Sequence, residues 1–590
     1  MAKFLIRFLL AFIIFLTSFH PSAYAEKKVD VMKIAIPKDE NTLTPYTYVT
    51  GYPGLDLVHL VYDTLLQLDE KNTPQPWLAK DYKVSEDGKT YDFTLHENIK
   101  WHDGKPLTVD DIKFTVDYFI KNPKSRFTNP LKVIQEVSIT DDSHFKFILS
   151  EADPNFLIQP LADVPILPKH IWEAVSNPNE ATNAIGSGPY ILEDYKTGQF
   201  YKMKANKDYF KGASPVQQLI FPIIEDPTAM FTALKAKEVD AISSSITPEV
   251  VSEFKSNPNL KIEEGPGFST TLFQFNAEKY PMSEKSFRQA VAYAIDNQYL
   301  VDTVTLGFAQ TGSPGFIHPS SPFYNKDLSF KPDMNKAKDI LDQAGFVDKD
   351  GDGFREGANG EKIKLVNLVY STSPLRIRTA EIITEWLKDI GINVEVRAMD
   401  ATTVDSLVWP DFDVSKGRNF DLALWSWSNT MQLFPDRMIE LFHSDPSIGS
   451  VNIGGYKNKE FDDLSKELSQ TYESSKRTEI IKNMQEFVAD EFPIVPLYHD
   501  KIVNAYTPAV YDQFSFQEGK GIINKLSFVP SSQSKTATKN TSDDNQSGEV
   551  KTDTENKGSN NSLFFLVGFI VLLIAGGIFL KQKSNKNTDV

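Results

Sequence analysis

The 590-residue sequence contains no cysteine. A thiol nucleophile, a disulfide framework, a cysteine metal cluster and a lipid anchor on an N-terminal cysteine are therefore excluded. Histidine is scarce as well, and its nine residues form no HExxH or other close pair of metal ligands. Neither a Walker A loop nor a GxSxG elbow occurs. Because no catalytic constellation is found, we expect a protein that is not an enzyme.

Positive charge is in deficit. The chain has 62 Lys and Arg against 79 Asp and Glu, a formal net charge of −17. An acidic surface repels the phosphate backbone, so we expect no nucleic acid as a partner.

Long apolar runs are confined to the two ends of the chain. At the N-terminus, Lys3 and Arg7 precede an apolar run over residues 8–19, and Ala23-Tyr24-Ala25 supplies a small-x-small cleavage pattern. An uncleaved membrane helix is disfavoured because the run is short. We expect residues 1–25 to be a signal peptide that is cleaved after Ala25.

The second apolar run extends from Leu563 to Leu580 and contains no charged side chain. At about 1.5 Å per residue it reaches roughly 27 Å, close to the thickness of a hydrocarbon core. Lys581, Lys583 and Lys586 follow it, and positive residues stay on the cytoplasmic side. The pattern predicts a transmembrane helix over 563–580 and a cytoplasmic tail over 581–590. The protein is then a single-pass protein of the cell membrane, with its body outside.

Residues 531–562 separate this run from the body. They are mostly Ser, Thr, Asn, Asp, Lys, Gln and Gly, with almost nothing apolar. Such a segment buries too little surface to offset the entropy lost on ordering. We therefore expect a disordered tether.

The remaining body, residues 26–530, is too long for one core and should divide into two or three lobes. Thr108 and Asp111 form the start of a capping box, and the apolar positions that follow have helical spacing. A second stripe with this spacing begins at Phe287. Both predict amphipathic helices packed on a core.

Elements of an α/β fold follow one another in the third quarter of the chain. The patterns predict a strand over 365–370, a helix over 376–390 that ends at Gly391, a strand over 392–396 and a strand over 420–427. In the helix, Ile383, Trp386, Leu387 and Ile390 are expected to point inward. This succession indicates α/β lobes.

The last of these strands carries Trp425 and Trp427 and is followed by Asn429 and Thr430. In open α/β sheets, ligands bind beyond the carboxyl ends of strands, and aromatic residues beside polar groups suit a binding cleft. Since the two tryptophans are two residues apart, they face one side of the strand. A place in the core is the alternative for both.

Seven stretches together resemble the family 5 extracellular solute-binding proteins, which are the oligopeptide-, dipeptide- and nickel-binding receptors of ABC importers. They are WLAKDYKVSEDGKTYDFTLHENIKWHDGKPLTVDDIKFTVDYF from Trp77, GSGPYIL from Gly186, KEVDAI from Lys237, FRQAVAYAID from Phe287, AKDILDQAGF from Ala337, FDLALWSWS from Phe420 and DEFPIVPLYH from Asp490. The resemblance covers about residues 33–528.

The resemblance implies an α/β fold of the type II periplasmic-binding-protein-like kind, a hinged clamshell with three lobes. Lobe I would comprise residues 26–70, 190–275 and 496–530, lobe II residues 71–189, and lobe III residues 276–495. We expect the chain to cross between lobes at 273–276 and 493–497. Phe275 and Asn276, at the first crossing, then join Trp425, Trp427, Asn429 and Thr430 as expected ligand-binding residues.

The resemblance also implies a monomer that captures a small solute and presents it to an ABC permease. Peptide-binding members carry an aspartate shortly after the tryptophan that matches Trp427, which pairs with the α-ammonium of the peptide. Here the stretch is Ser428-Asn429-Thr430. A peptide stays the expected solute, with a metal chelate or an oligosaccharide as alternatives. An anchored ligand sensor with the same fold is the alternative function.

The stretch DKDGDGFREG, residues 348–357, begins like an EF-hand loop. It fails as one, because position twelve is Asn359 where a bidentate glutamate is required, and a strand pattern follows where a helix should. A weaker calcium loop that uses Asp348, Asp350, Asp352 and Glu356 is expected to be structural, and a polar turn is the alternative. No cofactor is required.

Overall fold

The computed structural model describes residues 28–427, 434–471 and 473–530, which belong to one compact unit, Met1–Ala537. The expected signal peptide, tether, transmembrane helix and cytoplasmic tail, residues 1–25 and 531–590, lie outside the described residues. Among the residues described, no helix is long and apolar enough to cross a membrane.

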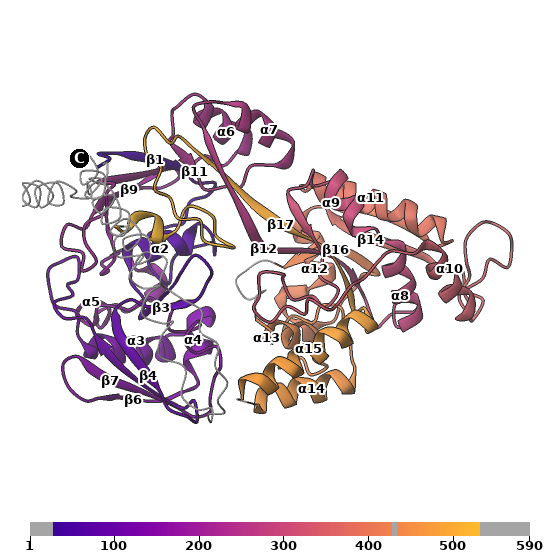
Figure 1. Cartoon of the computed structure of the whole chain (residues 1–590), viewed down its shortest axis with the longest axis horizontal. Coiled ribbons are helices and arrows are strands. Elements are labelled where there is room, and N and C mark those ends of the chain that lie inside the picture. The colour runs from indigo at the N-terminus through magenta and orange to yellow at the C-terminus, as the bar shows by residue number, and fades with distance from the viewer. Residues whose placement is uncertain (1–27, 428–433, 472, 531–590) are drawn as a thin grey trace, which may run out of the picture. The chain divides into compact units, whose positions relative to one another are not determined.

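A mixed sheet of eleven strands runs through the described chain (Figure 1). Along one path its order is β15 (Asn393–Met399), β14 (Lys364–Tyr370), β16 (Leu422–Trp427), β12 (Lys261–Phe275), β17 (Ile494–Tyr506), β11 (Ala241–Ile242), β1 (Met32–Ala35), β10 (Gln218–Pro222), β9 (Phe200–Ala205) and β8 (Tyr190–Lys196). The eleventh strand, β13 (Ala309–Thr311), pairs with β17.

The long antiparallel strands β12 and β17 join two packed regions, as Figure 1 shows. Val503 packs in a core with α6 (Pro227–Lys235) and α7 (Pro248–Ser256), and Phe273 packs in the core of the third lobe. Pairing between the two strands is interrupted between Pro266 and Thr270. The change of core therefore lies near residues 266–270. Phe273 and Phe275, where we expected the crossing, are already inside the third lobe.

The first two lobes share one hydrophobic core. Around it lie α2 (Gly54–Val61), the pair β2 (Leu66–Leu68) and β3 (Pro74–Pro76), a four-stranded sheet ordered β4 (Ala79–Val84), β5 (Thr90–Leu95), β7 (His144–Leu149) and β6 (Ile134–Ile139), and three helices, α3 (Val109–Lys121), α4 (Ser125–Leu131) and α5 (Lys169–Trp172). The predicted capping box is confirmed, because Asp111 Oδ2 accepts from the Thr108 N–H at 2.9 Å. These two lobes are thus one packed body.

The third lobe contains the predicted succession of strand, helix, strand and strand. β14 pairs in parallel with β15 and β16, and α11 (Pro374–Asp389) connects β14 to β15. Gly391 follows α11 at φ +81°, a conformation that side chains other than glycine rarely adopt. Trp386 packs against the third-lobe core, as predicted, but is only partly buried, with its ring against that of Tyr299. It lies at the margin of the apolar stripe, where the helical period alone does not decide burial.

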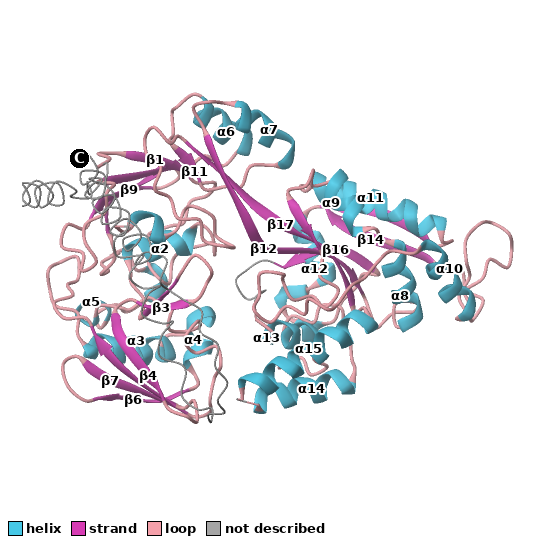
Figure 2. Cartoon of the chain, viewed as in Figure 1, coloured by secondary structure: helices cyan, strands magenta, loops and turns pink. Residues whose placement is uncertain are grey.

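Helices cover both faces of these strands (Figure 2). One face packs on α8 (Lys285–Ala294), α9 (Asn297–Thr303), α10 (Met334–Gln343) and α11, and the other on α12 (Ala401–Val408), α13 (Asp436–Phe442), α14 (Lys459–Gln470) and α15 (Ser474–Glu491). Each face has its own hydrophobic core.

Candidate functional site

A cavity of about 380 Å³ lies against the first two lobes. Its wall includes Asp56 and His59 of α2, Arg126 of α4, Asp163 of the segment between β7 and α5, and Lys520 near the end of the described body. Charged side chains reach this cavity from segments far apart in the sequence, because the shared core brings α2, α4 and the C-terminal segment together.

The four charged groups of the cavity form two ion pairs. Lys520 Nζ lies 2.8 Å from Asp56 Oδ1, and the Arg126 guanidinium donates to both oxygens of Asp163 at 2.9 and 2.8 Å. Burial acts to raise the pKa of Asp163, but Arg126 more than offsets it and holds that pKa below its usual range. Burial raises the pKa of Asp56 against the opposing effect of Lys520. The wall is therefore charged but balanced.

His59 adds a polar group without charge. Burial, reinforced by the neighbouring ammonium groups of Lys520 and Lys525, lowers the pKa of His59 to about 3. Its Nε2 lies 3.1 Å from the main-chain oxygen of Asp163. At neutral pH the ring is a neutral hydrogen-bonding group of the wall.

The third lobe also reaches this cavity. Phe434, which precedes α13, lines it and packs with Phe268 and Ile158. Nearby, Asn155 Nδ2 of the second lobe donates to Asp436 Oδ2 of α13 at 2.7 Å. Because Phe268 belongs to the interrupted stretch of β12, side chains from all three lobes meet at the edge of the cavity.

Comparison with known proteins agrees with this arrangement. Residues 73–449 match the family model described as "Bacterial extracellular solute-binding proteins, family 5 Middle". The chain belongs to this family. This confirms the predicted resemblance to the receptors of ABC importers. The protein is a solute-binding receptor.

Individual relatives are similar over most of their length. The "Oligopeptide-binding protein AppA" of Bacillus subtilis is 30% identical, with 78% of this chain and 84% of the relative aligned. A crystal structure of Bacillus subtilis AppA in complex with a nonapeptide has a TM-score of 0.65 at 26% identity and covers 82% of this chain and 95% of its own. A structure of NikZ from Campylobacter jejuni in complex with Ni(L-His) has a TM-score of 0.67 at 27% identity, covering 82% and 94%.

In this family 5 chain, Trp425 and Trp427 are almost fully buried, with 6% and 7% of their surface exposed. Their rings touch, and the Arg437 guanidinium lies 4.7 Å from the Trp427 ring. Within the described chain the two indole N–H groups have no hydrogen-bond acceptor. Both rings pack in the core on one face of the third lobe. Asn429 and Thr430, the other residues predicted after this strand, lie outside the described residues.

Phe275 and Asn276 do not line the cavity. Phe275 is fully buried in the third-lobe core, and Asn276 Nδ2 donates to the main-chain oxygen of Phe420 at 2.8 Å. They attach the end of β12 to the segment before β16. The prediction that they contact ligand rested on a crossing at this point, and the chain changes core earlier.

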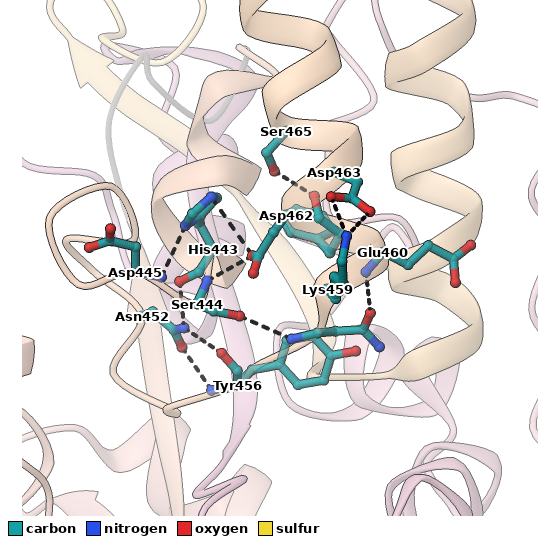
Figure 3. Close-up of polar contacts among 12 residues, drawn as sticks. His443, Ser444, Asp445, Asn452, Tyr456, Lys459, Glu460, Asp462, Asp463 and Ser465 are labelled. Atoms are coloured by element: carbon teal, nitrogen blue, oxygen red, sulfur yellow. Dashed lines mark hydrogen bonds and ion pairs between the residues drawn. The ribbon is translucent and has the colours of Figure 1, made fainter.

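A polar network fixes the C-terminal end of α13, the helix that carries Arg437 and Asp436 (Figure 3). Asn452 Nδ2 donates to the main-chain oxygens of His443 and Tyr456 at 3.1 and 2.8 Å, and its Oδ1 accepts from the Tyr456 N–H at 3.0 Å. Asp462 of α14 accepts from the Ser444 N–H at 2.9 Å. The loop from α13 to α14 is thereby tied to both helices.

The sequence reasoning missed the charged residues of the cavity. A signal for two of them was present: α2 reads GLDLVHLV, in which Asp56 and His59 interrupt an apolar helix. A charged residue inside such a helix is rarely buried unless it has a partner or a function. Asp163 carried the same kind of signal, since it stands in the apolar stretch PLADVPIL, whereas Arg126 and Lys520 lie among polar residues.

The aspartate loop joins α10 to β14, as predicted. Carboxylate oxygens of Asp348, Asp350 and Glu356 lie within 4.8 Å of one another. Asp352, the fourth expected ligand, instead pairs with Lys362 Nζ at 2.8 Å, and this ammonium also lies 2.5 Å from Asp350. Three of the four predicted oxygen ligands therefore come together, with a lysine already in contact with one of them.

Proposed function

We propose that this family 5 protein is an extracellular, membrane-tethered receptor that captures a peptide and delivers it to an ABC permease. It would act as a monomer and carry out no chemistry on its ligand. The observation that carries the proposal is the cavity at which all three lobes contribute side chains. Its volume lies within the roughly 300–1,000 Å³ usual for small-ligand sites. The similarity to an oligopeptide-binding protein of Bacillus subtilis supports the peptide as solute.

The mechanism is lobe closure driven by the ligand. A solute that touches Phe434 and the Asp56–Lys520 side of the cavity together makes contacts that exist only when the lobes are close. Strands β12 and β17 would accommodate the motion near residues 266–270, where their pairing is interrupted. The closed form is then what the permease recognises.

The ligand is tested by mass spectrometry of molecules that co-purify with the full chain, followed by thermal-shift titration. Peptides are expected to raise the melting temperature, while pools of oligosaccharides and metal–amino acid chelates are not. Arg126→Gln should weaken the peptide effect because it removes one wall of the cavity, and the exposed Arg397→Gln should not. A shift with chelates or oligosaccharides alone would replace the peptide as solute.

Transport is separated from sensing in cells. Deletion of the gene is expected to abolish uptake of the captured peptide. Loss of a transcriptional response with normal uptake would instead favour an anchored sensor.

The membrane attachment rests on the apolar run 563–580 and the lysines that follow it. We expect the full chain in the membrane fraction and a chain that ends at residue 562 in the medium. Retention of the shortened chain in the membrane would contradict the tether.

A structural calcium ion at the aspartate loop is also proposed, supported by the proximity of Asp348, Asp350 and Glu356. Calcium would displace the Lys362 ammonium from Asp350 and stabilise the third lobe. The melting temperature should be higher in calcium than in chelator, and Asp350→Asn should remove the difference. Equal melting in both conditions would leave a polar turn.

A further inference from the structure

Another cavity, of about 330 Å³, lies where β8 begins and β9 ends, and it shares no lining residue with the cavity described above. Three lysines line it: Lys100, which precedes a tight turn, Lys204 of β9, and Lys207 in the loop after β9. This cavity is termed the lysine pocket. Asp208 is the one carboxylate among its lining residues. The lining therefore carries a net positive charge.

The lysines of the pocket are exposed and poorly neutralised. Within the described chain, Lys100 and Lys207 form no ion pair. Lys204 Nζ lies 3.9 Å from Glu193 Oε1, and the other oxygen of that carboxylate lies 3.0 Å from Lys202 Nζ. Because the whole chain has a formal net charge of −17, this positive surface is a local feature, and it attracts anions.

The wall beside the lysines is held in place by hydrogen bonds. The Gly186 N–H donates to His102 Nδ1 at 3.3 Å, so His102 Nε2 carries the proton and donates to the Gly188 main-chain oxygen at 3.0 Å. Burial lowers the pKa of His102 to about 4, so this ring is neutral at pH 7. The ring of Trp101 is 2% exposed, and its indole N–H has no acceptor within the described chain. The partial positive charge of that N–H also favours an anion in the pocket.

The kind of charge in the wall selects the kind of anion. A carboxylate is bound best by the planar fork of a guanidinium, and no arginine lines the pocket. Separate ammonium groups act as point charges and suit a phosphate, which presents oxygens in several directions. A phosphate group therefore fits the lysine pocket better than a carboxylate does.

The loop that carries Lys207 also contacts the end of the described body. Its Gly212 lies against Pro530, since a Cβ placed on the glycine would stand 3.4 Å from Pro530 Cγ. The Gly212 N–H donates to the main-chain oxygen of Tyr209 at 2.8 Å, and Tyr209 packs with Leu526. The predicted tether follows Pro530 in the sequence. The tether thus leaves the body at the loop that forms one wall of the lysine pocket.

An aromatic ring lies in the same loop. Phe210 is only partly buried, and Lys211 Nζ lies 5.3 Å from the centre of its ring and 4.6 Å from that of Trp77. Aromatic rings beside lysines are typical of surfaces that meet the headgroup region of a membrane. This feature favours a phosphate of the membrane over a free phosphate.

We propose that the lysine pocket binds the phosphate of an anionic phospholipid headgroup and so holds the body beside the membrane surface. The inference rests on the proposed tether and adds to it a contact between the body and the membrane. A lysine near an anionic bilayer strengthens binding by about fivefold, so three lysines contribute about 100-fold together. The tether keeps the pocket at a high effective concentration near the headgroups, because it leaves the body at the same loop.

Acetylation of lysines in the full chain, reconstituted with vesicles and measured by mass spectrometry, tests the pocket. With vesicles of phosphatidylglycerol and phosphatidylcholine, Lys100, Lys204 and Lys207 should react at least about fivefold more slowly than with phosphatidylcholine alone. Exposed Lys459 of the third lobe should react equally with both. Inorganic phosphate added to the phosphatidylcholine sample should protect none of these lysines.

Two variants separate the pocket from a general attraction of lysines to the vesicles. Lys207→Gln should reduce the protection of Lys100 and Lys204 by about fivefold, because one of three charges is lost. Lys132→Gln, on exposed surface outside the pocket, should leave that protection unchanged. An unaltered melting temperature shows that both variants are folded.

Sedimentation with the vesicles distinguishes failure of the pocket from failure of the tether. If the chain sediments with both kinds of vesicle and the pocket lysines react equally in both, or if Lys207→Gln keeps full protection, the pocket proposal falls and the tether stands. Protection by inorganic phosphate alone would overturn the membrane contact in favour of a free phosphate. Sedimentation with phosphatidylglycerol vesicles only, lost in Lys207→Gln, would support the pocket and overturn the tether. A chain that sediments with neither kind and shows no protection overturns both.

Discussion

The cavity of the first two lobes and the carboxyl end of β16 in the third lobe treat charge in opposite ways. In the cavity, Asp56 pairs with Lys520 and Asp163 pairs with Arg126, so the charges cancel within each pair. At β16, Arg376 and Asp500 lie on the same side of the sheet without an ion pair between them. In the first region Arg126 more than offsets the burial of Asp163, so the pKa of that carboxyl is lowered. In the second region only a hydrogen bond and the charge of Arg376 oppose the burial of Asp500, so its pKa is raised.

A third ion pair, between Asp63 and Lys525, is buried more completely than the two pairs of the cavity. Asp63 and Lys525 are 0% and 1% exposed, with Nζ 2.6 Å from Oδ1. The same carboxylate accepts from Trp77 Nε1, Tyr209 Oη and Ser187 Oγ at 2.9, 3.0 and 3.0 Å. The Asp63 carboxylate thus accepts from three neutral donors and from Lys525. Because Asp63 lies just after α2, this ion pair joins the C-terminal segment to that helix.

The largest effect is expected from opening this closed pair. Lys525→Met leaves the Asp63 carboxylate buried without a cation and should reduce the free energy of unfolding by about 3–5 kcal/mol. Denaturant unfolding measures the loss. The control is Lys71→Met, which removes a lysine that is 76% exposed from its pair with Glu518 and should change stability by less than about 1 kcal/mol. Equal effects of the two variants would show that burial does not distinguish the pairs.

Asp500, which has no cation partner among the described residues, should destabilise the fold when it is ionised. Because the pKa of Asp500 is raised to about 6, against an ordinary value near 3.9, the unliganded protein loses stability as pH rises from 4 through 6. Asp500→Asn removes this loss, so at pH 8 the variant should be more stable than the wild type by about 2–3 kcal/mol. Below pH 4 the two should melt together. A variant less stable at pH 8 would mean that Asp500 is paired in solution.

Ionisation of Asp163 should raise the free energy of unfolding, opposite to Asp500, and by a smaller amount. Its pKa lies below the ordinary value, so its contribution is present above about pH 4 and lost as pH falls through the folded-state pKa. Asp163→Asn should reduce the free energy of unfolding by about 1–2 kcal/mol at pH 7, and the difference should shrink with acidification. Exposed Asp117→Asn is the control and should have little effect. A loss independent of pH would point to packing and not to charge.

The smallest effect is expected from a network without net charge. Asn452→Ala removes three hydrogen bonds of the α13–α14 loop and should lower the free energy of unfolding by about 1 kcal/mol. The loss should be the same at pH 5 and pH 8, since an amide does not titrate. Thermal unfolding at both values measures it, and a difference between them would implicate His443 or Asp462.

Local patterns predicted much of the fold because they depend on neighbours in sequence. The capping box at Thr108, the helix end at Gly391 and the strand at Trp425 were all readable from spacing and residue type. Trp386 faces the core as predicted, but the helical period does not tell how deeply a residue at the edge of the apolar face is buried. The change of core along β12 was misplaced for a related reason: a strand alternates in the same way whichever lobe it packs on.

The candidate site was less predictable. Trp425 and Trp427 were singled out correctly as large aromatics at a strand end, but neither periodicity nor composition could tell a cleft from a core, and both rings are buried. Arg376 and Asp500 are 124 positions apart and carry no local motif. Whether a charged side chain forms an ion pair depends on which segments meet in the fold, so paired and unpaired charges cannot be told apart in a sequence.

By itself, the sequence determined the class of protein. The seven family stretches sufficed for a solute-binding receptor, because each depends on residue type and short spacing. Only the tertiary structure decided which charges are closed by a partner and which stay open. An ion pair requires its two groups to lie within a few ångströms of each other. The register of β12 with β17 and the packing of α11 on β17 bring residues that are far apart in the sequence close together.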